Sequence, residues 1–518
     1  MKDFMEICDR LKKQKIDFEV VEFGDTAISA RTSDTSMGKN YDPKNAIKTL
    51  VVKTDAGFTA VVVGGSDRVD DKKLSALIGK WRVATGDELV KLELVAGGVC
   101  PLVLEIKTLV DKKLMSQKIW SMGAGDTKHG INVKLEVVLD HLKCKVVSIA
   151  EEKNMDTEEK IRLITRNCQE VLTEEDLRAL IESGTPLSHY IGFEISGLVH
   201  LGTGLLSMGK IADFLQAGAK CRIFLADFHT FLNNKLGGKW EDIRWASESY
   251  FKEGLIASLK CFGVEGDQVE FISGKDLYES RPDHWQTFME VGKQVTLARD
   301  LRSISIMGKK QGTDVNMATL FYPPLQVADI VTLDINLAHA GMDQRKAHVI
   351  AREAIKKIPG KHQTPVAIHQ NLIAGLSGPQ AGDNDAESLK MSKSKPNSAV
   401  FIHDTPDEIR NKIKKAYGPP KEVEFNPLLN WVETLIFWGE KTGNFVVDRP
   451  ERFGGKVVYN TMADLTADYQ SEKLFPLDLK NALSDWLIEK LEPARKHFEI
   501  GKNAEALKKM KGLLGITG

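Results

Sequence analysis

The stretch from residue 188 to residue 226 constrains the fold more than any other part of this sequence. A strand-like run, HYIGFEIS, is followed by a glycine-rich turn, by a helical run through SMGKIADFLQAG and by a second apolar run, CRIFLA. Strand, glycine turn, helix and strand in this order predict a parallel βαβ unit. Parallel sheets bind their ligands at the carboxyl ends of the strands. We therefore expect an α/β fold with a site just after the first strand.

The chain divides into three predicted domains, because 518 residues are too many for one core and a domain averages about 150 residues. Residues 1–150 have an α+β pattern, and the charged run IAEEKNMDTEEK after them is a linker candidate. Residues 157–404 hold the βαβ unit, preceded by predicted helices over EEKIRLITRNCQEVL and TEEDLRALIES, the second with Thr173 as N-cap. Residues 405–518 look mostly helical.

The composition is that of an ordinary soluble protein, with 42% hydrophobic and 28% charged residues. The net charge of −1 gives no general basic field, so any nucleic-acid binding must depend on local patches. No apolar run approaches the ~18 residues that cross a bilayer, and the N-terminus lacks the apolar core of a signal peptide. The six cysteines are scattered without a CxxC pair. We expect a cytoplasmic protein with no membrane partner, disulfide framework or zinc site.

The string HLGTG, His200 to Gly204, begins the predicted helix after the first strand. Gly202 and Gly204 have no side chains, so a flat base could lie against the backbone there. The amides at the start of a helix favour phosphate. Glycine turns of this kind usually serve only chain geometry, so this string alone is a weak signal.

The string KMSKS, Lys390 to Ser394, lies in a polar stretch that also contains glycine. Two lysines beside small hydroxyl groups could close over a triphosphate and hold departing pyrophosphate. The alternative is a solvated basic loop. HLGTG and KMSKS together, in a βαβ context, resemble the class I aminoacyl-tRNA synthetases, which implies a Rossmann-type catalytic domain.

A polar stripe follows from the spacing in FYPPLQVADIVTL, where Tyr322, Gln326 and Asp329 fall on one face of a predicted helix that is otherwise apolar. The stripe faces either solvent or an internal pocket. If it faces a pocket, Asp329 needs a hydrogen-bonding partner, because an isolated buried carboxylate is costly. The hydroxyl of a tyrosine substrate would supply one.

These strings, together with GMDQRKAH, resemble the tyrosyl-tRNA synthetases of the archaeal and eukaryotic type from about residue 157 to nearly 500. The resemblance implies that Tyr190 and Asp329 hold the substrate hydroxyl. The implied tyrosine site consists of Tyr190, His229, Tyr322, Gln326, Asp329 and Gln344, of which Tyr322, Gln326 and Gln344 hold the ammonium group. Ile195 and Thr203 depart from the family pattern, which has proline and the second histidine of His-x-Gly-His at these positions.

The same resemblance implies an ATP site and a mechanism that depends on positioning and charge stabilisation. The implied ATP site consists of His200, Gly202, Thr203, Gly204, Asp343, Lys390, Met391, Ser392, Lys393 and Ser394, with Asp343 on the ribose. His200, Lys390 and Lys393 are the implied catalytic residues. The implied partners are L-tyrosine, ATP with Mg²⁺, tRNA(Tyr) and a second copy in a homodimer. No permanent cofactor or resident metal is expected.

The stretch RPERFGG…LFPLDLKNAL resembles the family's helical anticodon-binding domain. Phe453 and Asp478 match the positions that stack on and recognise the first anticodon base, while Phe475 stands where some relatives carry histidine. The alternative is a helix N-cap aspartate and two core aromatic residues. Two other functions remain open for the whole chain: a catalytically dead tRNA-binding scaffold, and a tryptophan-specific relative.

Residues 1–150 resemble the stand-alone YbaK/ProX-like deacylases, which hydrolyse mischarged tRNA. The resemblance implies a deacylase site at Lys48, Gly97, Gly98, Pro101 and His129, although Leu102 and Val103 replace the usual glycine. A tyrosine site that bonds the hydroxyl has little need of editing, because it rejects phenylalanine by roughly 10⁵, a factor measured on tyrosine enzymes themselves. The unit therefore either hydrolyses another, mischarged tRNA or only binds RNA without catalysis. The alternative for Lys48 is a lysine at the edge of a strand that serves solubility.

Overall fold

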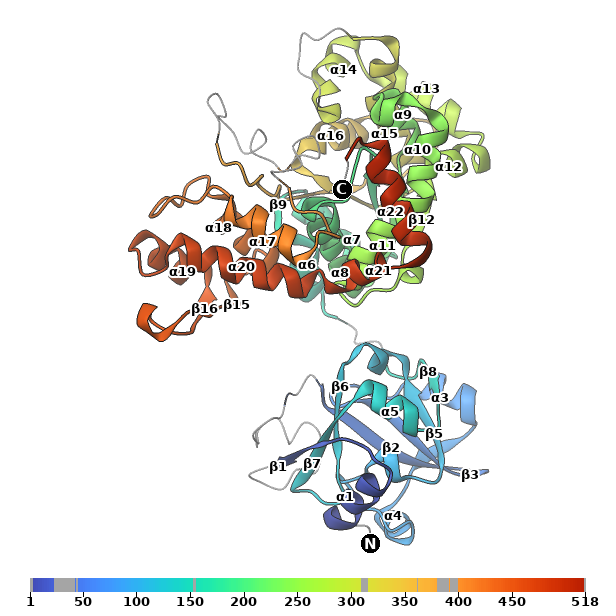
Figure 1. Ribbon diagram of the computed structural model, residues 1–518. Coiled ribbons are helices and arrows are strands. Elements are labelled where there is room, and N and C mark those ends of the chain that lie inside the picture. The colour runs from blue at the N-terminus through green and yellow to red at the C-terminus, as the bar shows by residue number, and fades with distance from the viewer. Residues whose placement is uncertain are drawn as a thin grey trace. The chain divides into compact units, whose positions relative to one another are not determined.

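The computed structural model describes residues 3–22, 42, 45–151, 155–308, 315–360, 362–379, 391 and 399–516 (Figure 1). The chain separates into two compact units, Met1–Asn154 and Met155–Gly518. Each has hydrophobic clusters of its own.

The first unit contains two sheets. A five-stranded sheet has the order β4-β2-β3-β5-β8, and a three-stranded antiparallel sheet has the order β1-β7-β6. The strands are β1 (Glu19–Glu22), β2 (Ile47–Thr54), β3 (Gly57–Gly64), β4 (Trp81–Val83), β5 (Lys107–Asp111), β6 (Ile119–Gly123), β7 (His129–Lys134) and β8 (Cys144–Val147). The helices are α1 (Phe4–Lys13), α3 (Asp71–Ile78), α4 (Gly86–Lys91), η2 (Pro101–Val103), η3 (Lys112–Ser116) and α5 (Leu135–His141). The first helix, α1, buries Ile7 and Leu11.

The second unit is built on a six-stranded sheet with the order β12-β11-β10-β13-β14-β9. The strands are β9 (Cys168–Leu172), β10 (Ser188–Phe193), β11 (Lys220–Leu225), β12 (Glu270–Ser273), β13 (Leu337–Gly341) and β14 (Val366–Gln370). All the pairs are parallel except that of β9 with β14. The strand order reverses between β10 and β13, and this is the place where such sheets bind ligands. The predicted α/β fold is therefore confirmed.

The predicted βαβ unit is β10, the π-turn η4 (Gly202–Leu206), α8 (Ser207–Gln216) and β11. The helix before it ends earlier than expected. The single helix predicted over EEKIRLITRNCQEVL is α6 (Thr157–Thr165) followed by strand β9. The buried ammonium group of Lys210 donates to the carbonyls of Leu163 and Ile164 at the end of α6, and the edge of the sheet recruits the residues beyond. Thr173 caps α7 (Glu174–Glu182) as predicted, by accepting from the Asp176 amide.

Helices surround this sheet. They are α9 (Asp227–Leu232), α10 (Trp240–Ala246), η6 (Ser247–Phe251), α11 (Lys252–Lys260), α12 (Gly274–Ser280), α13 (His284–Gln294), α14 (Leu297–Ser303), α15 (Met317–Thr332), η9 (Met342–Gln344) and α16 (Arg345–Ala354). The polar stripe predicted from sequence lies on α15, and the GMDQ segment forms η9 directly after β13. Both elements therefore border the point where the strand order reverses.

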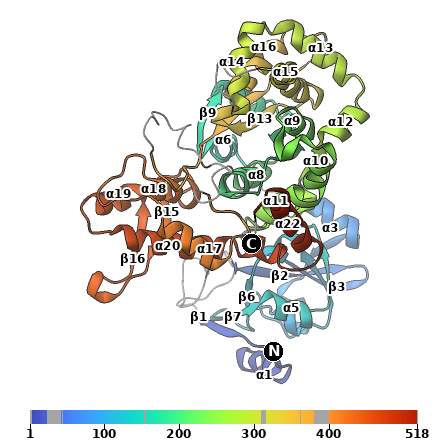
Figure 2. The same ribbon diagram turned by 45° about the horizontal axis from the view of Figure 1, so that its top comes forward.

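The C-terminal part contains α17 (Pro406–Lys414), α18 (Pro427–Trp431), α19 (Met462–Gln470), α20 (Pro476–Lys490), α21 (Glu492–His497) and α22 (Gly501–Leu513), with a hairpin of β15 (Thr442–Val447) and β16 (Val457–Thr461). Figure 2 shows α17 alongside α20. One hydrophobic cluster joins Ile223 of the sheet to Leu483 of α20 and Met510 of α22. The boundary predicted at residues 404 and 405 stays a prediction.

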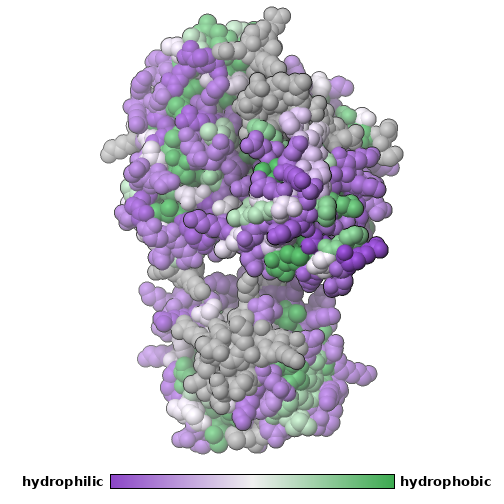
Figure 3. Space-filling model, turned by 90° about the vertical axis from the view of Figure 1, so that its left-hand side faces the viewer, coloured by the Kyte–Doolittle hydropathy of each residue, from purple (hydrophilic) through white to green (hydrophobic). Residues whose placement is uncertain are grey.

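The face drawn in Figure 3 is mostly hydrophilic, with scattered apolar side chains. None of the helices in the described ranges is long and apolar enough to span a bilayer.

Candidate functional site

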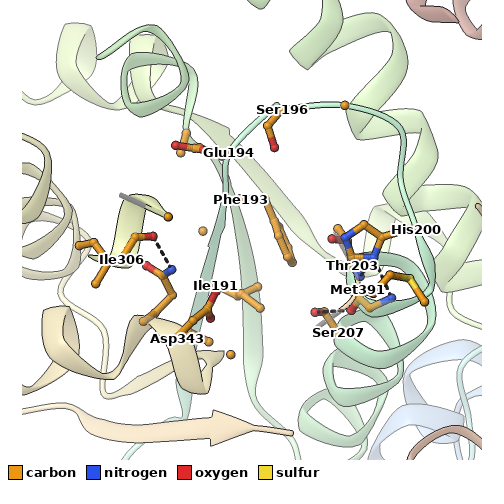
Figure 4. Close-up of a pocket in the computed structure, with 18 of the residues that line it drawn as sticks. Ile191, Phe193, Glu194, Ser196, His200, Thr203, Ser207, Ile306, Asp343 and Met391 are labelled. Atoms are coloured by element: carbon orange, nitrogen blue, oxygen red, sulfur yellow. Dashed lines mark hydrogen bonds between the residues drawn. The ribbon is translucent and has the colours of Figure 1, made fainter. Parts of the chain in front are cut away.

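A cavity of about 700 Å³ lies in the second unit at the carboxyl ends of β10 and β13 (Figure 4). It brings together most of the described residues that the sequence predicted for the tyrosine and ATP sites. The predicted residues that line it are Tyr190, His200, Gly202, Thr203, His229, Tyr322, Gln326, Asp343, Gln344 and Met391. Gly204 and Asp329 lie behind its wall. Lys390, Ser392, Lys393 and Ser394 lie outside the described residues.

One side of the cavity, called the His200 wall below, is formed by the HLGTG string, which leads into η4 and α8. Nδ1 of His200 accepts from the amide of Gly202 at 3.0 Å, so the imidazole keeps its other nitrogen, Nε2, as a donor when neutral. An N–H donor on this side of the cavity suits a phosphate oxygen. A Cβ on Gly202 would come within 3.0 Å of the His200 ring and 2.9 Å of a methyl of Ile373, so a larger residue there would displace these side chains.

Gly204 has a packing role. A Cβ at this position would lie 2.5 Å from a methyl of Ile402 and 2.9 Å from Oγ of Ser258. The glycine therefore lets η4 pack closely against neighbouring elements, and it does not line the cavity.

The segments on either side of residues 392–398 are bonded to this wall. The amide of Leu201 donates to the carbonyl of Val400 at 3.1 Å, and the amide of Ile402 donates to that of Val199 at 3.1 Å. The amide of Met391 donates to the carbonyl of Ile373 at 2.8 Å. Met391 of the KMSKS string and Phe401 both line the cavity, so one residue of the string and a residue shortly after it belong to the same site as His200.

Asp329 is fully buried on α15, which excludes the solvent-facing alternative for the polar stripe. Its Oδ1 accepts a hydrogen bond of 2.8 Å from the hydroxyl of Tyr278. Its Oδ2 has no hydrogen-bond partner among the described residues, and Nε2 of His229 lies 3.6 Å away. Nε2 of His284 lies 3.8 Å from Oδ1. Burial raises the pKa of Asp329 well above its usual range.

The two histidines beside Asp329 are neutral. Burial lowers the pKa of His229 to about 3 and that of His284 to about 4. They therefore give this carboxyl no cationic partner, and both nitrogens of His229 have no hydrogen-bond partner within the described ranges. Sequence reasoning missed Tyr278 and His284. Their only signal was that they are aromatic side chains, with Trp285, among the charged residues of KDLYESRPDHW.

Tyr190, on the central strand β10, lies close to Asp329 of α15. It is buried on β10, and burial together with the Asp329 carboxylate raises the pKa of its phenol well above the usual value. A Cβ at Gly192 would come 2.6 Å from the Tyr190 hydroxyl, so this glycine makes room for the phenol. Tyr190 and His229 separate Asp329 from the open part of the cavity.

Polar groups converge on the side of the cavity that lies away from His200. The Tyr322 hydroxyl donates to Oε1 of Glu194 at 3.2 Å, and Nε2 of Gln326 donates to Oε1 of Gln344 at 3.3 Å. Gln344 in turn donates to the carbonyl of Ile306 at 3.0 Å, a bond drawn in Figure 4. Oε1 of Gln326 is buried with no donor among the described residues. This bare oxygen suits an ammonium group, and sequence reasoning missed the nearby Glu194 although it directly follows β10.

The C-terminus contributes to the cavity as well. Leu514 and Ile516, which follow α22, line it together with His200 and Phe401. The sequence assigned this region only to a helical anticodon-binding domain. Phe498, which follows α21, packs edge-on to His403, and His403 stacks on Phe401 of the cavity wall, so the end of the chain returns to the cavity.

The predicted anticodon residues lie together in the C-terminal part. Asp478 is in the first turn of α20, and its Oδ2 lies 3.5 Å from the guanidinium of Arg449. It is not the N-cap, because that position is Phe475, whose side chain makes no capping bond. Phe453 is 53% exposed and Phe475 is 51% exposed, so neither is a core aromatic residue. Exposed aromatic rings beside a carboxylate fit stacking on a nucleobase.

The predicted deacylase residues occupy the first unit. Lys48 is half-buried on β2. Gly97 has a φ of 86°, and a Cβ on Gly98 would come 2.5 Å from the carbonyl oxygen of Asp126, so both positions require glycine. Nδ1 of His129 lies 2.7 Å from Oδ2 of Asp126.

The substitutions in the loop after Pro101 are accommodated. Pro101 begins η2, and Leu102 and Val103 are buried in the core of the unit. The ring of Phe4 stacks on His129 at a centroid distance of 4.1 Å.

Comparison with known proteins adds a family to this geometry. The family model described as tRNA synthetases class I (W and Y) matches residues 182–492, and the model described as aminoacyl-tRNA editing domain matches residues 29–141. The tyrosine–tRNA ligase of Thermococcus sibiricus is 49% identical over 375 residues, which cover 69% of this chain and 99% of that protein.

Solved structures agree with this comparison. The crystal structure of a tyrosyl-tRNA synthetase from Pyrococcus horikoshii, complexed with L-tyrosine, matches with a TM-score of 0.65 and 48% identity, covering 69% of this chain and 100% of that one. A tyrosyl-tRNA synthetase from Leishmania major in complex with tyrosinol matches with a TM-score of 0.61 and 30% identity, covering 70% and 66% of the two chains.

Proposed function

Because this chain belongs to the tyrosine–tRNA ligases of the class I tRNA synthetases, we propose that its second unit activates L-tyrosine with ATP and transfers the tyrosyl group to tRNA(Tyr). The observation that carries this proposal is the buried carboxyl of Asp329, whose Oδ2 faces the unbonded Nε2 of His229 at 3.6 Å. A phenol hydroxyl that enters between Tyr190 and His229 would satisfy this oxygen. Phenylalanine would leave it unsatisfied, which is costly in a buried site.

The opposite side of the pocket supports binding of the amino-acid ammonium group. Tyr322, Gln326 and Gln344 present oxygen acceptors there, and Oε1 of Gln326 has no competing donor within the described ranges. Glu194 adds a carboxylate that already bonds the Tyr322 hydroxyl. The carboxyl group of the substrate would then point toward the His200 wall, where ATP binds.

The first chemical step is displacement at phosphorus. An oxygen of the tyrosine carboxylate forms a bond to the α-phosphorus of ATP, the bond to the bridging oxygen breaks, and pyrophosphate leaves. Mg²⁺ enters with ATP as part of the substrate. The Nε2 donor of His200 and the lysines at 390 and 393 would stabilise the charge that develops on pyrophosphate, and Asp343 would bind the ribose. In the second step, the terminal ribose hydroxyl of the tRNA attacks the tyrosyl carbonyl and AMP leaves.

Amino-acid-dependent ATP–pyrophosphate exchange tests this function. The full chain with MgATP should exchange pyrophosphate with tyrosine and with none of the other nineteen amino acids. Exchange with tryptophan would support the tryptophan-specific alternative, and no exchange with any amino acid would support the dead scaffold. The Tyr190 and Asp329 pair argues against tryptophan, because an indole has no matching hydroxyl.

We also propose that tRNA(Tyr) is read in the C-terminal part, with Phe453 stacked on the first anticodon base and Asp478 bonded to it. The exposed rings of Phe453 and Phe475 and the nearby Arg449 support this proposal. The cytoplasm, where translation takes place, is the compartment we propose. The six thiols, none of which is paired in a disulfide, fit that reducing environment.

The active assembly that we propose is a homodimer. Five large apolar side chains are exposed on α13, α14 and α15: Trp285, Met289, Leu297, Met317 and Phe321. The rings of Phe288 and Phe321 lie edge to face with centroids 6.0 Å apart, which ties α13 to the start of α15. Exposed apolar patches of this kind mark protein interfaces. Light scattering should give twice the mass of the chain, and Met289→Glu should lower it.

For the first unit, which matches an aminoacyl-tRNA editing domain, we propose hydrolysis of a mischarged tRNA in trans. Water would add to the ester carbonyl and the ribose oxygen would leave with a proton. Lys48 would position the acylated end, and backbone amides of the Gly97–Pro101 loop other than that of Gly98, which already donates to the carbonyl of Val95 at 3.0 Å, would stabilise the oxyanion. The close packing of that loop on Asp126, which fixes its backbone, favours this function. Non-catalytic RNA binding is the alternative.

A further inference from the structure

A row of buried polar side chains crosses the sheet of the second unit from behind the cavity to its wall, which Gln370 and Ser207 help to line. Nε2 of His189 on β10 lies 3.1 Å from Nδ1 of His339 on β13. Nε2 of His339 lies 2.9 Å from Oε1 of Gln370 on β14. Both histidines are completely buried and Gln370 is nearly so. The row therefore connects three neighbouring strands by side-chain hydrogen bonds.

The row continues into η4 and the first residue of α8, Ser207. Nε2 of Gln370 donates to Oγ of Ser207 at 3.0 Å, and this hydroxyl donates to the carbonyl of Gly202 at 3.1 Å. The Ser207 amide donates to the same carbonyl and closes the π-turn η4. Ser207 lies beside His200 and Thr203 in Figure 4. The hydroxyl of Ser207 therefore holds the π-turn η4 beside His200, and Gln370 of the sheet orients that hydroxyl.

The direction of every hydrogen bond in this row is fixed. Burial lowers the pKa of His189 to about 3 and that of His339 well below its usual value, so each imidazole is neutral and has one N–H. The Gln370 oxygen accepts from His339, so Nδ1 of His339 must accept from His189. Nδ1 of His189 is then a bare acceptor, in keeping with its having no partner among the described residues. The glutamine amide and the serine hydroxyl complete one donor-to-acceptor series that ends on Gly202.

We propose that Gln370 and Ser207 are positioning residues for ATP, which hold the Gly202–Leu206 turn in the geometry that the nucleotide requires. Local π-turns are frequently found at functional sites, and this one is closed by a bond that a side chain reinforces. This inference rests on the proposed function, because it assigns the His200 wall to the nucleotide. Tyrosine binds among other residues, so it should be insensitive to the row.

Steady-state exchange kinetics and tyrosine binding test the proposal in the full chain. Ser207→Ala and Gln370→Leu should each raise the KM for ATP by about tenfold, the usual effect of losing one hydrogen bond in such a site. The Kd for tyrosine should not change. Gln370→Glu keeps the size but loses the donor to Ser207, so it should behave like Gln370→Leu. The matched control is Ser484→Ala, which removes a buried serine hydroxyl bonded to the carbonyl of Lys480, outside the row.

Two further results separate this role from direct contact with ATP. His339 is completely buried behind the cavity wall, so it cannot touch the nucleotide. The variant His339→Leu should nevertheless raise the KM for ATP, as Ser207→Ala does. Nitrogen NMR of the wild-type protein should show His339 protonated at Nε2. An unchanged KM in Ser207→Ala and His339→Leu, or the other tautomer, would overturn the proposal. If the wild type itself lacked tyrosine-dependent exchange, the proposed function would fail, while the NMR result would still decide the state of the row.

Discussion

The hydroxyl of Tyr278 donates to Oδ1 of Asp329 at 2.8 Å and leaves Oδ2 of the same carboxyl facing Nε2 of His229 at 3.6 Å. The two oxygens thus have separate tasks: one is held by the protein, and the other is left for a ligand. Tyr278 also stacks on His284 at 4.1 Å, so the ring that holds Oδ1 is itself fixed.

Replacing Asp329 should reduce selection of tyrosine over phenylalanine. Asp329→Ala removes the partner of the substrate hydroxyl, and removing one partner of a buried hydrogen bond costs about 1–3 kcal/mol. The ratio of kcat/KM for the two amino acids in pyrophosphate exchange measures this loss. Tyr278→Phe is the matched control: it removes the donor to Oδ1 and leaves Oδ2, so it should change the ratio less. An unchanged ratio in Asp329→Ala would mean that another group reads the hydroxyl.

Lys393→Ala should slow adenylate formation far more than it weakens tyrosine binding. This lysine lies outside the described residues, but Met391 before it and Phe401 after it in the sequence line the cavity. Its charge should act on pyrophosphate as it leaves, which affects the transition state more than the ground state. Single-turnover rates and equilibrium tyrosine binding separate the two effects. Equal effects on both would point to a structural role for the loop.

Anticodon recognition should be separable from amino-acid activation. Asp478→Ala and Phe453→Ala are expected to lower kcat/KM for charging of tRNA(Tyr) and to leave tyrosine-dependent pyrophosphate exchange unchanged. The loss of one stacked base is worth about 1–3 kcal/mol, which corresponds to roughly a five- to 150-fold decrease. Val458→Ala, an exposed apolar residue on β16, serves as a control. Charging that is insensitive to both anticodon variants would remove these residues from the interface.

The first unit should deacylate a tRNA charged with a small amino acid. The full chain is incubated with alanyl-, cysteinyl-, seryl- and tyrosyl-tRNA, and release of the amino acid is followed over time. Hydrolysis of one of the first three should be lost in Lys48→Ala and retained in Lys53→Ala, which changes another lysine of β2. Inertness toward every substrate, or activity indifferent to Lys48, would leave RNA binding as the function of this unit.

Acid should destabilise the second unit through its buried histidines. Burial lowers the pKa of His403 to about 3, whereas an unfolded histidine titrates near 6.5. Above about pH 6.5 this histidine is neutral in both states and does not lower the free energy of unfolding. As the pH falls from 6.5 toward 3, the free energy of unfolding decreases, because the unfolded chain binds a proton that the folded chain does not. Asp329, whose pKa is raised, acts in the opposite direction.

The contribution of this histidine can be measured by denaturation between pH 6 and 4. Wild type should lose about 1.4 kcal/mol per pH unit more than His403→Asn, the equivalent of one proton. Replacing the exposed His141, on α5 of the first unit, is the control, because this residue belongs to the other compact unit and makes no contribution to the unfolding of the second. Identical slopes in wild type and His403→Asn would show that His403 is charged in the folded protein.

The sequence by itself determined the features that short stretches encode. The βαβ unit follows from local periodicity and glycine placement, and the spacing of Tyr322, Gln326 and Asp329 placed them on one helix face before any contact was known. Spacing alone left solvent and a pocket as alternatives for that face. The strings HLGTG and KMSKS also indicated the family, through their resemblance to those of the class I aminoacyl-tRNA synthetases.

Only the tertiary structure decided the partners that come from distant parts of the chain. Tyr278 reaches Asp329 across 51 residues, and Gln370 reaches Ser207 across 163. The strand β9 was predicted as helix because its local sequence permits both, and pairing with β14 settled the outcome. Leu514 and Ile516 enter the cavity for the same reason. Such contacts are fixed by burial and by hydrogen bonds that form only when remote segments pack together, and no local pattern encodes them.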